Sequence, residues 1–543
     1  MEGFGKATSK NNNSNPRTII NAIGQSLYRN AINHHRRGDL AKAENDYREA
    51  IRVGYLHHAI YSNLGVICNN SGRAKEAIYL YKKSIEIFPG NPDAYLNLSI
   101  LCKGSGDLDQ ALAYALKYIE LKPTDPNGRM HLGILYKDLG RLNEALETTL
   151  KSIELKPTNP STYKNLGGIY KSLGCLDQAL TSTLKCIQLK PDNPSAYKNL
   201  GEIYKDLGNL DMAIESTLKS IKLEPTDPAA HLNMAMTYEA INELDHALSS
   251  YTLAAALSIK HKEEIRLTSL VSSSIIFLQK NKIEKALALL TEARKISSAK
   301  TKIPQQAQSI NEKNNIAYLR YLDRLIPEIP ATEALHDSQI IHIGESHCLA
   351  FINQKIQAKD IKLLIKPSLI KGAKAFHLRE ASKTSIQKIG FERRTQQDIG
   401  SYKYIFLSFG EIDCRADEGI MKHCQKTGNA IKDTSREIAN LYFEWTAQRL
   451  STNIKKVVYF GTPAPYKTEQ IKNQSTEDDD RRLLAIRIFN ATIKEQCEQN
   501  GIFFADVYRL TAGKDGYNNN DWMIDGIHLK PKALNSLMKG ILF

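Results

Sequence analysis

One stretch decides the fold of the first half of the chain: Tyr163-Lys-Asn-Leu-Gly-Gly-Ile-Tyr-Lys-Ser-Leu-Gly174-Cys-Leu-Asp-Gln-Ala179. Its apolar residues have helical spacing over 165–173, and Gly174 stands where a first helix must turn back. A second helix is expected over 176–189, with the small Ala179 where two helices approach each other closely. A pair of prolines follows and ends this helix, because proline cannot continue a helix interior. The stretch therefore predicts a helical hairpin.

The same pattern recurs at a constant interval of 34 residues on both sides of this stretch. Glycine, alanine and both prolines keep the interval in phase. A single helical hairpin cannot bury its apolar face alone, so neighbouring hairpins are expected to stack into a solenoid. The series are Gly38, Gly72, Gly106, Gly140, Gly174 and Gly208; Ala43, Ala77, Ala111, Ala145, Ala179, Ala213 and Ala247; Pro89, Pro123, Pro157, Pro191 and Pro225; and Pro92, Pro126, Pro160, Pro194 and Pro228.

The pattern Asn-Leu-Gly-x-x-Tyr, the glycine in mid-repeat, the alanine and the closing proline resemble the tetratricopeptide repeat. The resemblance implies an α-solenoid of helical hairpins over 24–299. Seven units are clear up to residue 261, and a diverged eighth over 262–299 has the properties of a capping repeat. We expect a disordered tail over 1–23 and a helical linker over 300–335.

Asparagine recurs in one register on the first helix of the repeats, and lysines join the same helices. In tetratricopeptide families that carry this asparagine, it faces the concave surface and hydrogen-bonds an extended peptide backbone. The resemblance thus implies a polar, positive groove for a protein or peptide partner. The alternative is that the asparagines bridge adjacent repeats and the lysines are solvated. The residues are Asn63, Asn97, Asn165, Asn199 and Asn233, with His131 in the gap, Lys164 and Lys198 in one lysine register, and Lys137, Lys171 and Lys205 in another.

After residue 336 the pattern changes from helical spacing to short apolar runs, which is typical of an alternating β/α domain. Strands with helical crossovers predict a parallel sheet covered on both faces. In a flavodoxin-like order, 2-1-3-4-5, ligands collect at the carboxyl ends of the first and third strands. The expected strands are 339–343, 361–365, 404–408, 456–460 and 502–507, and the clearest helices are 433–450 and 480–499.

Chemically active residues follow the first, third and fifth of these strands. The segments are Gly344-Glu345-Ser346-His347, then Gly410-Glu411-Ile412-Asp413-Cys414-Arg415, and finally Asp525-Gly526-Ile527-His528. A serine nucleophile needs a base within hydrogen-bond reach and a third group that orients the base. An Asp and a His three residues apart can supply both from one loop. The alternative for Ser346 alone is an ordinary helix cap.

Together these segments resemble the SGNH (GDSL-type) hydrolase family over 336–543. The resemblance implies Ser346 as nucleophile, His528 as general base and Asp525 as the residue that orients His528. It also implies an oxyanion hole made by the backbone N–H groups of Ser346 and Gly372. The family's third block carries an asparagine donor where this chain has Ile412. Loss of one oxyanion donor typically costs about 100 to 1,000-fold in rate, and nearby Arg415 is a candidate for a compensating donor.

Two functions remain open from the sequence. The first is a serine esterase that hydrolyses small acyl or acetyl esters, for instance on carbohydrate, with the repeats recruiting a protein partner or substrate. The second is an interaction scaffold whose hydrolase-like domain is inactive or weakly active. The complete Ser, Asp and His set favours the first, and Ile412 favours the second.

The composition fits a cytoplasmic globular protein. The polar N-terminus does not resemble a signal peptide, and no apolar run is long enough for a membrane span. The eight cysteines are scattered without metal-binding spacing, so they are expected to be reduced, and neither a metal nor a cofactor is expected. The net charge of +14 favours acidic partners, but no nucleic-acid motif accompanies it.

Overall fold

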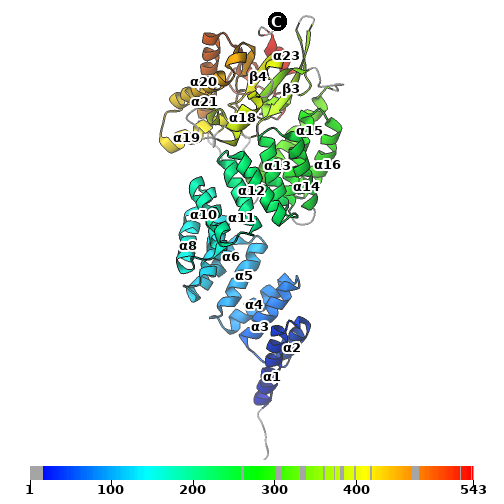
Figure 1. Ribbon diagram of the computed structural model, residues 1–543, viewed down its shortest axis with the longest axis vertical. Helices are drawn as coiled ribbons and strands as arrows, with labels where there is room; N and C mark the ends of the chain where they lie inside the picture. The colour runs from blue at the N-terminus through cyan, green and yellow to red at the C-terminus, as the bar shows by residue number, and fades with distance from the viewer. Residues whose placement is uncertain are drawn as a thin grey trace, which may run out of the picture. The chain divides into compact units, whose positions relative to one another are not determined.

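The computed structural model divides into two compact units, Met1–Pro191 and Asp192–Phe543. Each unit is considered separately, and Figure 1 gives the order of their elements along the chain. The residues described are 16–258, 262–300, 309–330, 338–358, 361–371, 373–379, 385–396, 399–415, 419–467, 476–525, 527–539 and 541.

The first unit consists of helical hairpins. Helix α1 begins at Pro16, within the segment expected as a disordered tail; residues 1–15 of that tail lie outside the described residues. Proline is favoured in the first turn of a helix, where its missing N–H has no partner to lose, which accounts for this start. The helices are α1 (Pro16–Arg36), α2 (Leu40–Arg52), α3 (His58–Asn70), α4 (Ala74–Ile87), α5 (Pro92–Gly104), α6 (Leu108–Leu121), α7 (Pro126–Asp138), α8 (Leu142–Leu155), α9 (Pro160–Ser172) and α10 (Leu176–Leu189).

The α9–α10 hairpin shows how the repeated residues form each tetratricopeptide-like hairpin. Asn159 caps α9 by accepting a hydrogen bond from the Ser161 backbone N–H at 3.1 Å. Gly174 has φ = +76° in the turn, a left-handed conformation that glycine adopts without a steric penalty. Ala179 is fully buried where the two helices meet. The 34-residue period therefore reflects one turn residue and one close contact in every hairpin.

The second unit begins with three more hairpins and a further helix. The last hairpin, α15–α16, occupies the segment expected as the diverged eighth repeat. Helix α17 lies in the expected linker and starts with a capping box between Ser309 and Glu312. The helices are α11 (Pro194–Asp206), α12 (Leu210–Leu223), α13 (Pro228–Ala240), α14 (Leu244–Leu257), α15 (Glu263–Gln279), α16 (Ile283–Lys300) and α17 (Ile310–Leu325).

Within the described residues, a six-stranded sheet follows in the order β2-β3-β1-β4-β5-β6. All neighbouring strands are parallel except β2, which runs antiparallel to β3. Strand β2 was not among the expected strands, because four residues at a sheet edge give too short an alternation to recognise. The strands are β1 (Ser338–Gly344), β2 (Lys355–Ala358), β3 (Ile361–Leu369), β4 (Tyr404–Ser408), β5 (Val457–Phe460) and β6 (Phe503–Ala505).

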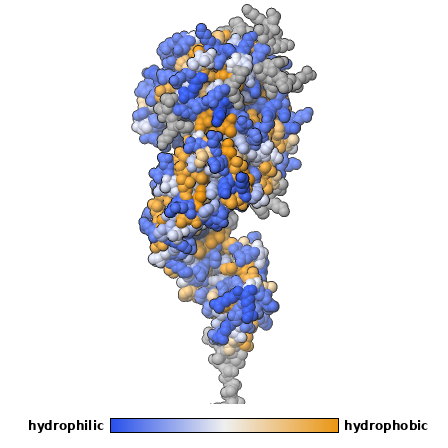
Figure 2. Space-filling view, in the orientation of Figure 1, coloured by the Kyte–Doolittle hydropathy of each residue, from blue (hydrophilic) through white to orange (hydrophobic). Residues whose placement is uncertain are grey.

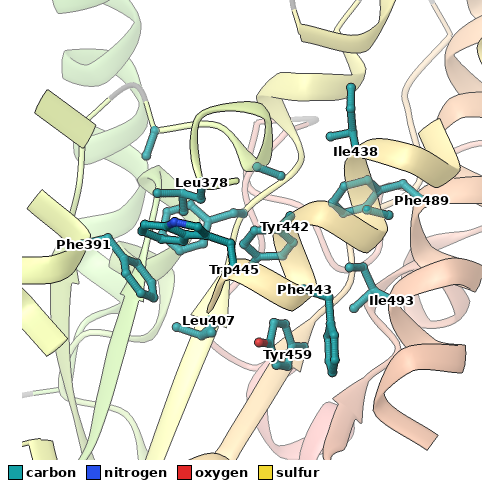
Figure 3. Close-up of a cluster of buried hydrophobic side chains, with 14 of the residues drawn as sticks. Leu378, Phe391, Leu407, Ile438, Tyr442, Phe443, Trp445, Tyr459, Phe489 and Ile493 are labelled. Carbon is teal, nitrogen blue, oxygen red and sulfur yellow. The ribbon is translucent and has the colours of Figure 1, made fainter. Parts of the chain in front are cut away.

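Helices cover both faces of the sheet, because alternate side chains of a strand point to opposite faces. Leu407 and Tyr459 pack with Tyr442 and Phe443 of α20 and with Phe489 of α21, as Figure 3 shows. The opposite face packs against α23 and the segment after β1. The helices are α18 (Ile386–Gln396), α19 (Gly419–Thr427), α20 (Ile431–Arg449), α21 (Thr476–Asn500), α22 (Val507–Thr511) and α23 (Ala533–Met538). Short 3-10 helices are η2 (Ile326–Glu328), η3 (Ser346–Phe351), η4 (Ala375–His377), η5 (Ile399–Ser401), η6 (Ile412–Cys414) and η7 (Ser451–Lys456).

Within the second unit, the last repeat helices and the sheet domain share a hydrophobic core. Leu270 of α15, Leu290 of α16 and Leu322 of α17 belong to one buried cluster with Leu349 and Leu369 of the sheet domain. Polar contacts cross the same boundary: the side-chain oxygen of Gln279 accepts a hydrogen bond from the Leu369 backbone N–H at 3.0 Å. The end of the repeats is therefore packed into the sheet domain.

The visible surface is mostly hydrophilic, with separate hydrophobic patches (Figure 2). Some exposed leucines recur at the repeat interval on the second helices of the hairpins: Leu116, Leu150, Leu184 and Leu218. Among the described helices, none combines the length and the apolar character needed to cross a membrane.

Candidate functional site

Ser346 lies directly after β1, at the first position of η3. The turn into η3 requires glycine at residue 344, because a Cβ atom there would lie 2.2 Å from Ser408 Oγ and 2.7 Å from the Ser408 carbonyl oxygen. The backbones of β1 and β4 approach closely at this point and place Ser346 at the carboxyl edge of the sheet. Its side chain is buried, with 7% of the residue exposed.

Asp525 and His528 come from a tight turn after the last strand. Met523 and Leu529 form an antiparallel bridge, and the Ile524 backbone N–H donates to the His528 carbonyl at 2.7 Å. Inside the turn, Asp525 Oδ1 accepts hydrogen bonds from the backbone N–H groups of Ile527 at 3.0 Å and His528 at 2.8 Å. These bonds fix the Asp525 carboxylate beside the imidazole of His528.

The structure brings Ser346, His528 and Asp525 into one hydrogen-bonded chain. His528 Nε2 lies 2.9 Å from Ser346 Oγ, and His528 Nδ1 lies 2.7 Å from Asp525 Oδ2. Because an ionised carboxylate only accepts hydrogen bonds, Nδ1 carries the proton and Nε2 is left to accept from the serine hydroxyl. Burial raises the pKa of Asp525, but the hydrogen bonds from His528 and Ile527 outweigh burial and hold this pKa at about 2. Asp525 is therefore ionised at neutral pH.

Tyr321 of α17 covers one face of His528, a contact that the sequence did not identify. The two rings stack with centroids 3.8 Å apart and planes at 18°. Arg324, one turn further along α17, donates from Nη1 to the Ile524 carbonyl at 3.3 Å. The sequence predicts a helical linker over 300–335, and helical spacing alone does not specify what its side chains contact.

A second group of titratable side chains lies beside Ser346. Glu345 Oε1 accepts from the Glu411 backbone N–H at 3.1 Å, and burial and the nearby Glu411 carboxylate raise the pKa of Glu345 well above its usual value. Burial raises the pKa of Glu411 as well, but the Arg415 guanidinium outweighs burial and lowers it. His347 Nε2 bonds to the Ile527 carbonyl at 2.9 Å, and burial lowers the pKa of His347 to about 4. At neutral pH, His347 is therefore uncharged, and burial favours the protonated form of Glu345.

Glu345, His347 and Glu411 could together hold a cation, since each offers a ligand atom within 4.8 Å of the others. Arg415 already supplies a positive charge to Glu411, and burial favours the form of Glu345 that carries no charge. The group therefore already contains one compensating cation, the Arg415 guanidinium. Beside it lies a cavity of about 10 Å³, lined in part by His342 and Glu345, with room for about one water molecule.

Arg415, Ile412 and Gly372 are the residues that bear on the expected oxyanion hole. Arg415 donates three hydrogen bonds to the Glu411 carboxylate, at 2.6 to 3.1 Å, and among the described residues it makes no hydrogen bond to Ser346. Ile412 begins η6 and is half-buried. Gly372 lies outside the described residues.

Several asparagines of the repeats contact neighbouring helices. Asn63 Nδ2 donates to Tyr47 Oη at 3.1 Å, Asn165 Nδ2 donates to Thr149 Oγ1 at 3.2 Å, and Asn233 Nδ2 donates to the Lys198 carbonyl at 3.4 Å. Asn165 and Asn233 are buried, with 5% and 4% of the residue exposed. These contacts bridge helices of adjacent repeats, which is the arrangement described by the alternative to groove binding.

The other groove candidates differ in their surroundings. Asn97, Asn199 and Lys164 are half-buried. Lys198 Nζ pairs with Asp227 Oδ2 at 2.6 Å, so its charge is partly compensated. His131 Nε2 lies 2.8 Å from Ser99 Oγ, and burial lowers the pKa of His131 to about 4. Lys205 Nζ donates to Asn233 Oδ1 at 3.3 Å.

Comparisons with known proteins identify the repeats. Tetratricopeptide repeat models match residues 28–92, 70–127, 127–159 and 194–227, and a TPR repeat model matches 167–208. A search of curated proteins gives no significant match.

The chain is also similar to solved structures of tetratricopeptide repeat proteins. A tetratricopeptide repeat protein of Parabacteroides merdae is 18% identical, with a TM-score of 0.40, and covers 49% of this chain and 99% of its own. A thermophilic TPR protein of Thermus thermophilus is 23% identical, with a TM-score of 0.30, and covers 33% and 98%. YrrB, described as a TPR protein with an unusual peptide-binding site, is 20% identical, with a TM-score of 0.29, and covers 34% and 95%. The chain carries an array of tetratricopeptide repeats that begins near residue 28 and extends to about residue 227.

Proposed function

We propose that residues 336–543 form a serine esterase of the SGNH (GDSL) type. The observation that carries the proposal is the chain from Ser346 Oγ through His528 to Asp525, with links of 2.9 and 2.7 Å. Its location supports the same reading, since Ser346 follows β1 where β1 lies between β3 and β4. The parallel strands lie in the order β3-β1-β4-β5-β6, with the antiparallel β2 beside β3, and this order supports the proposal.

The mechanism is acyl transfer in two steps. Ser346 Oγ attacks the ester carbonyl carbon while His528 Nε2 takes the hydroxyl proton, and the imidazolium returns this proton to the leaving alcohol. Water, deprotonated by His528, then attacks the acyl-serine, and Ser346 recovers its proton as the acid leaves. Asp525 keeps Nδ1 protonated and stabilises the positive imidazole in both steps.

The oxyanion formed in each step needs donors. The backbone N–H groups of Ser346 and Gly372 are the donors that the family resemblance implies. Arg415 is held by Glu411 in the structure, so a third donor requires this guanidinium to reach the oxyanion with its remaining N–H groups. With Ile412 in place of asparagine, we expect turnover about 100 to 1,000-fold below that of a site with three donors.

The substrate class that we propose is a small acyl or acetyl ester, with carbohydrate esters as the leading candidates, in the cytoplasm. The repeat array would bind a protein or peptide and bring substrate or partner to the esterase. Such arrays commonly present an extended binding surface. Among the side chains of the proposed groove, Asn97, Lys164 and Asn199 are half-buried, whereas Asn165 and Asn233 are buried.

The test is hydrolysis of p-nitrophenyl acetate, together with labelling by a fluorophosphonate, in the full chain. Wild type should hydrolyse the ester and become labelled, and Ser346→Ala should lose both. Ser435→Ala is the matched control, because Ser435 is fully buried in α20 of the same domain and its hydroxyl donates to the Ile431 carbonyl of that helix. Labelling that persists in Ser346→Ala would refute the assignment of the nucleophile.

The second candidate function is an interaction scaffold whose hydrolase-like domain does not turn over esters. Ile412 is the observation that favours it. An absence of both hydrolysis and labelling in wild type would support this function over the esterase. A peptide pulldown that compares wild type with a variant carrying alanine at Asn165, Asn199 and Asn233 tests the groove. Unchanged capture would exclude these side chains as the peptide contacts, and circular dichroism would verify that the repeats remain folded.

A further inference from the structure

We propose that Tyr321 is a positioning residue for His528, so that a helix outside the sheet domain completes the proposed active site. The inference rests on the proposed esterase for its catalytic consequence. The contact itself is independent of that function: a tyrosine of α17 stacks on the histidine of a loop more than 200 residues later.

The contacts of His528 divide into two kinds. The bonds from its ring nitrogens to Asp525 and Ser346 restrain the imidazole within its own plane. They resist tilting out of that plane only weakly, because a hydrogen bond tolerates moderate bending. The Tyr321 ring, 3.8 Å away and inclined by 18°, blocks one face. The His347 ring is a second neighbour, with its centroid 5.2 Å from that of His528.

Tyr321 can restrain the His528 ring because α17 is itself held in place by neighbouring helices. Asn315 Nδ2 donates to Thr268 Oγ1 of α15 at 2.8 Å, and Arg294 of α16 donates from Nε to Asp323 Oδ1 at 2.9 Å. Leu322 and Leu325 are buried in the core shared with α15 and α16. The position of the Tyr321 ring is therefore set by the last repeat helices.

The same helix also holds the backbone of the catalytic turn. The Arg324 bond to the Ile524 carbonyl attaches α17 to the residue directly before Asp525. Tyr321 and Arg324 are three residues apart, which puts both on one face of the helix. One face of α17 thus contacts the His528 ring and the start of the turn that carries it.

The ring of Tyr321, and not its hydroxyl, makes the contact. Tyr321 is 1% exposed, and its Oη has no hydrogen-bond partner among the described residues. Phenylalanine should therefore replace it without loss, since a buried hydroxyl without a partner stabilises nothing. Leucine is apolar too, but it has no flat face to lie against the imidazole.

The experiment compares full-length wild type with Tyr321→Phe, Tyr321→Leu and the control Leu319→Ala. Leu319 is buried in the core around α17, so its truncation weakens packing without removing the stack. Small displacements of reacting groups cost up to about 100-fold in rate. We expect Tyr321→Leu to lower kcat for p-nitrophenyl acetate by about 10 to 100-fold with KM unchanged. Tyr321→Phe and Leu319→Ala should keep the wild-type kcat.

A second readout does not depend on turnover. Histidine ring protons are followed by NMR in ¹³C-histidine-labelled protein, with the His528 signal assigned by its loss in His528→Gln. The stacked Tyr321 ring should shift this signal upfield in wild type and Tyr321→Phe, and the shift should disappear in Tyr321→Leu. If wild type shows the shift but hydrolyses no ester, the esterase fails and the positioning contact stands. A His528 signal that is the same in Tyr321→Leu and wild type, or an equal kcat in an active enzyme, would overturn the proposal.

Discussion

His347 should make the stability of the sheet domain depend on pH. The residue is 5% exposed, and burial, followed by the nearby charge of His528, lowers its pKa to about 4. In the unfolded chain its imidazole titrates near its ordinary value of about 6.5. Between these two values the unfolded state binds a proton that the folded state excludes. The stabilisation is therefore complete above pH 6.5 and is lost as the pH falls toward 4.

The size of the effect follows from the two pKa values. One pKa unit corresponds to about 1.4 kcal/mol. A pH of about 5 lies roughly 1.5 units below the pKa of about 6.5 in the unfolded chain, so the unfolded histidine is mostly protonated, while the folded histidine is still mostly neutral. His347 alone should therefore lower the free energy of unfolding by about 2 kcal/mol between pH 7.5 and pH 5. This loss is a large fraction of the stability of a typical domain.

The assay is urea unfolding followed by tryptophan fluorescence, because Trp445 and Trp522 are the two tryptophans of the chain and both lie in the sheet domain. His347→Gln keeps a donor for the Ile527 carbonyl but cannot titrate. Between the two pH values it should lose about 2 kcal/mol less stability than wild type. His131→Gln is the control: its histidine has a similar pKa but lies in the first unit. Equal losses in wild type and His347→Gln would refute the reasoning.

Two further predictions concern the same edge of the sheet. Gly344→Ala should destabilise the domain by about 1 to 3 kcal/mol in the same assay, because its Cβ would lie 2.7 Å from the Ser408 backbone oxygen. The control is Gly390→Ala, which should cost less because the nearest atom to its Cβ would lie 3.4 Å away. An equal loss of stability in both variants would exclude the close approach at Gly344 as the cause. Ile412→Asn should raise kcat for p-nitrophenyl acetate by about 10-fold or more, because it adds an oxyanion donor. The control Ile412→Val should leave kcat unchanged. An unaltered kcat in Ile412→Asn would show that residue 412 does not face the oxyanion.

The repeats could be predicted from the sequence because each hairpin depends on local requirements. A left-handed turn at Gly174 and a close helix contact at Ala179 restrict the residue type at these two positions. The 34-residue repeat can therefore be recognised in the amino-acid sequence. Strand β2 and the early start of α1 at Pro16 have no comparable requirement. The first is a short edge strand, and the second is the start of a helix that no repeated residue marks, so neither produces a distinctive pattern.

The candidate site also contains residues that could be predicted from the sequence and contacts that could not. The segments of Ser346, Asp525 and His528 could be found because each follows a strand, and parallel strands bring their carboxyl ends to one edge. The stack of Tyr321 on His528 depends on how α17 packs, which helical spacing does not specify. Arg415 was a candidate oxyanion donor from sequence proximity alone. The turn at η6 instead places it against Glu411, four residues earlier.

The charges around Ser346 determine how the proposed esterase would work. His347 is neutral, burial favours the protonated form of Glu345, and Arg415 compensates Glu411. Asp525 is the carboxylate that is hydrogen-bonded to His528. The imidazolium formed during acyl transfer is thus stabilised mainly by Asp525. A negative Glu345, in contrast, would repel the oxyanion that forms on the neighbouring serine. Burial, by favouring the protonated form of Glu345, weakens this repulsion without adding a donor. In the proposed esterase, the side chains of the site would therefore favour removal of the serine proton more than they would stabilise the oxyanion, and the rate would depend on the backbone donors.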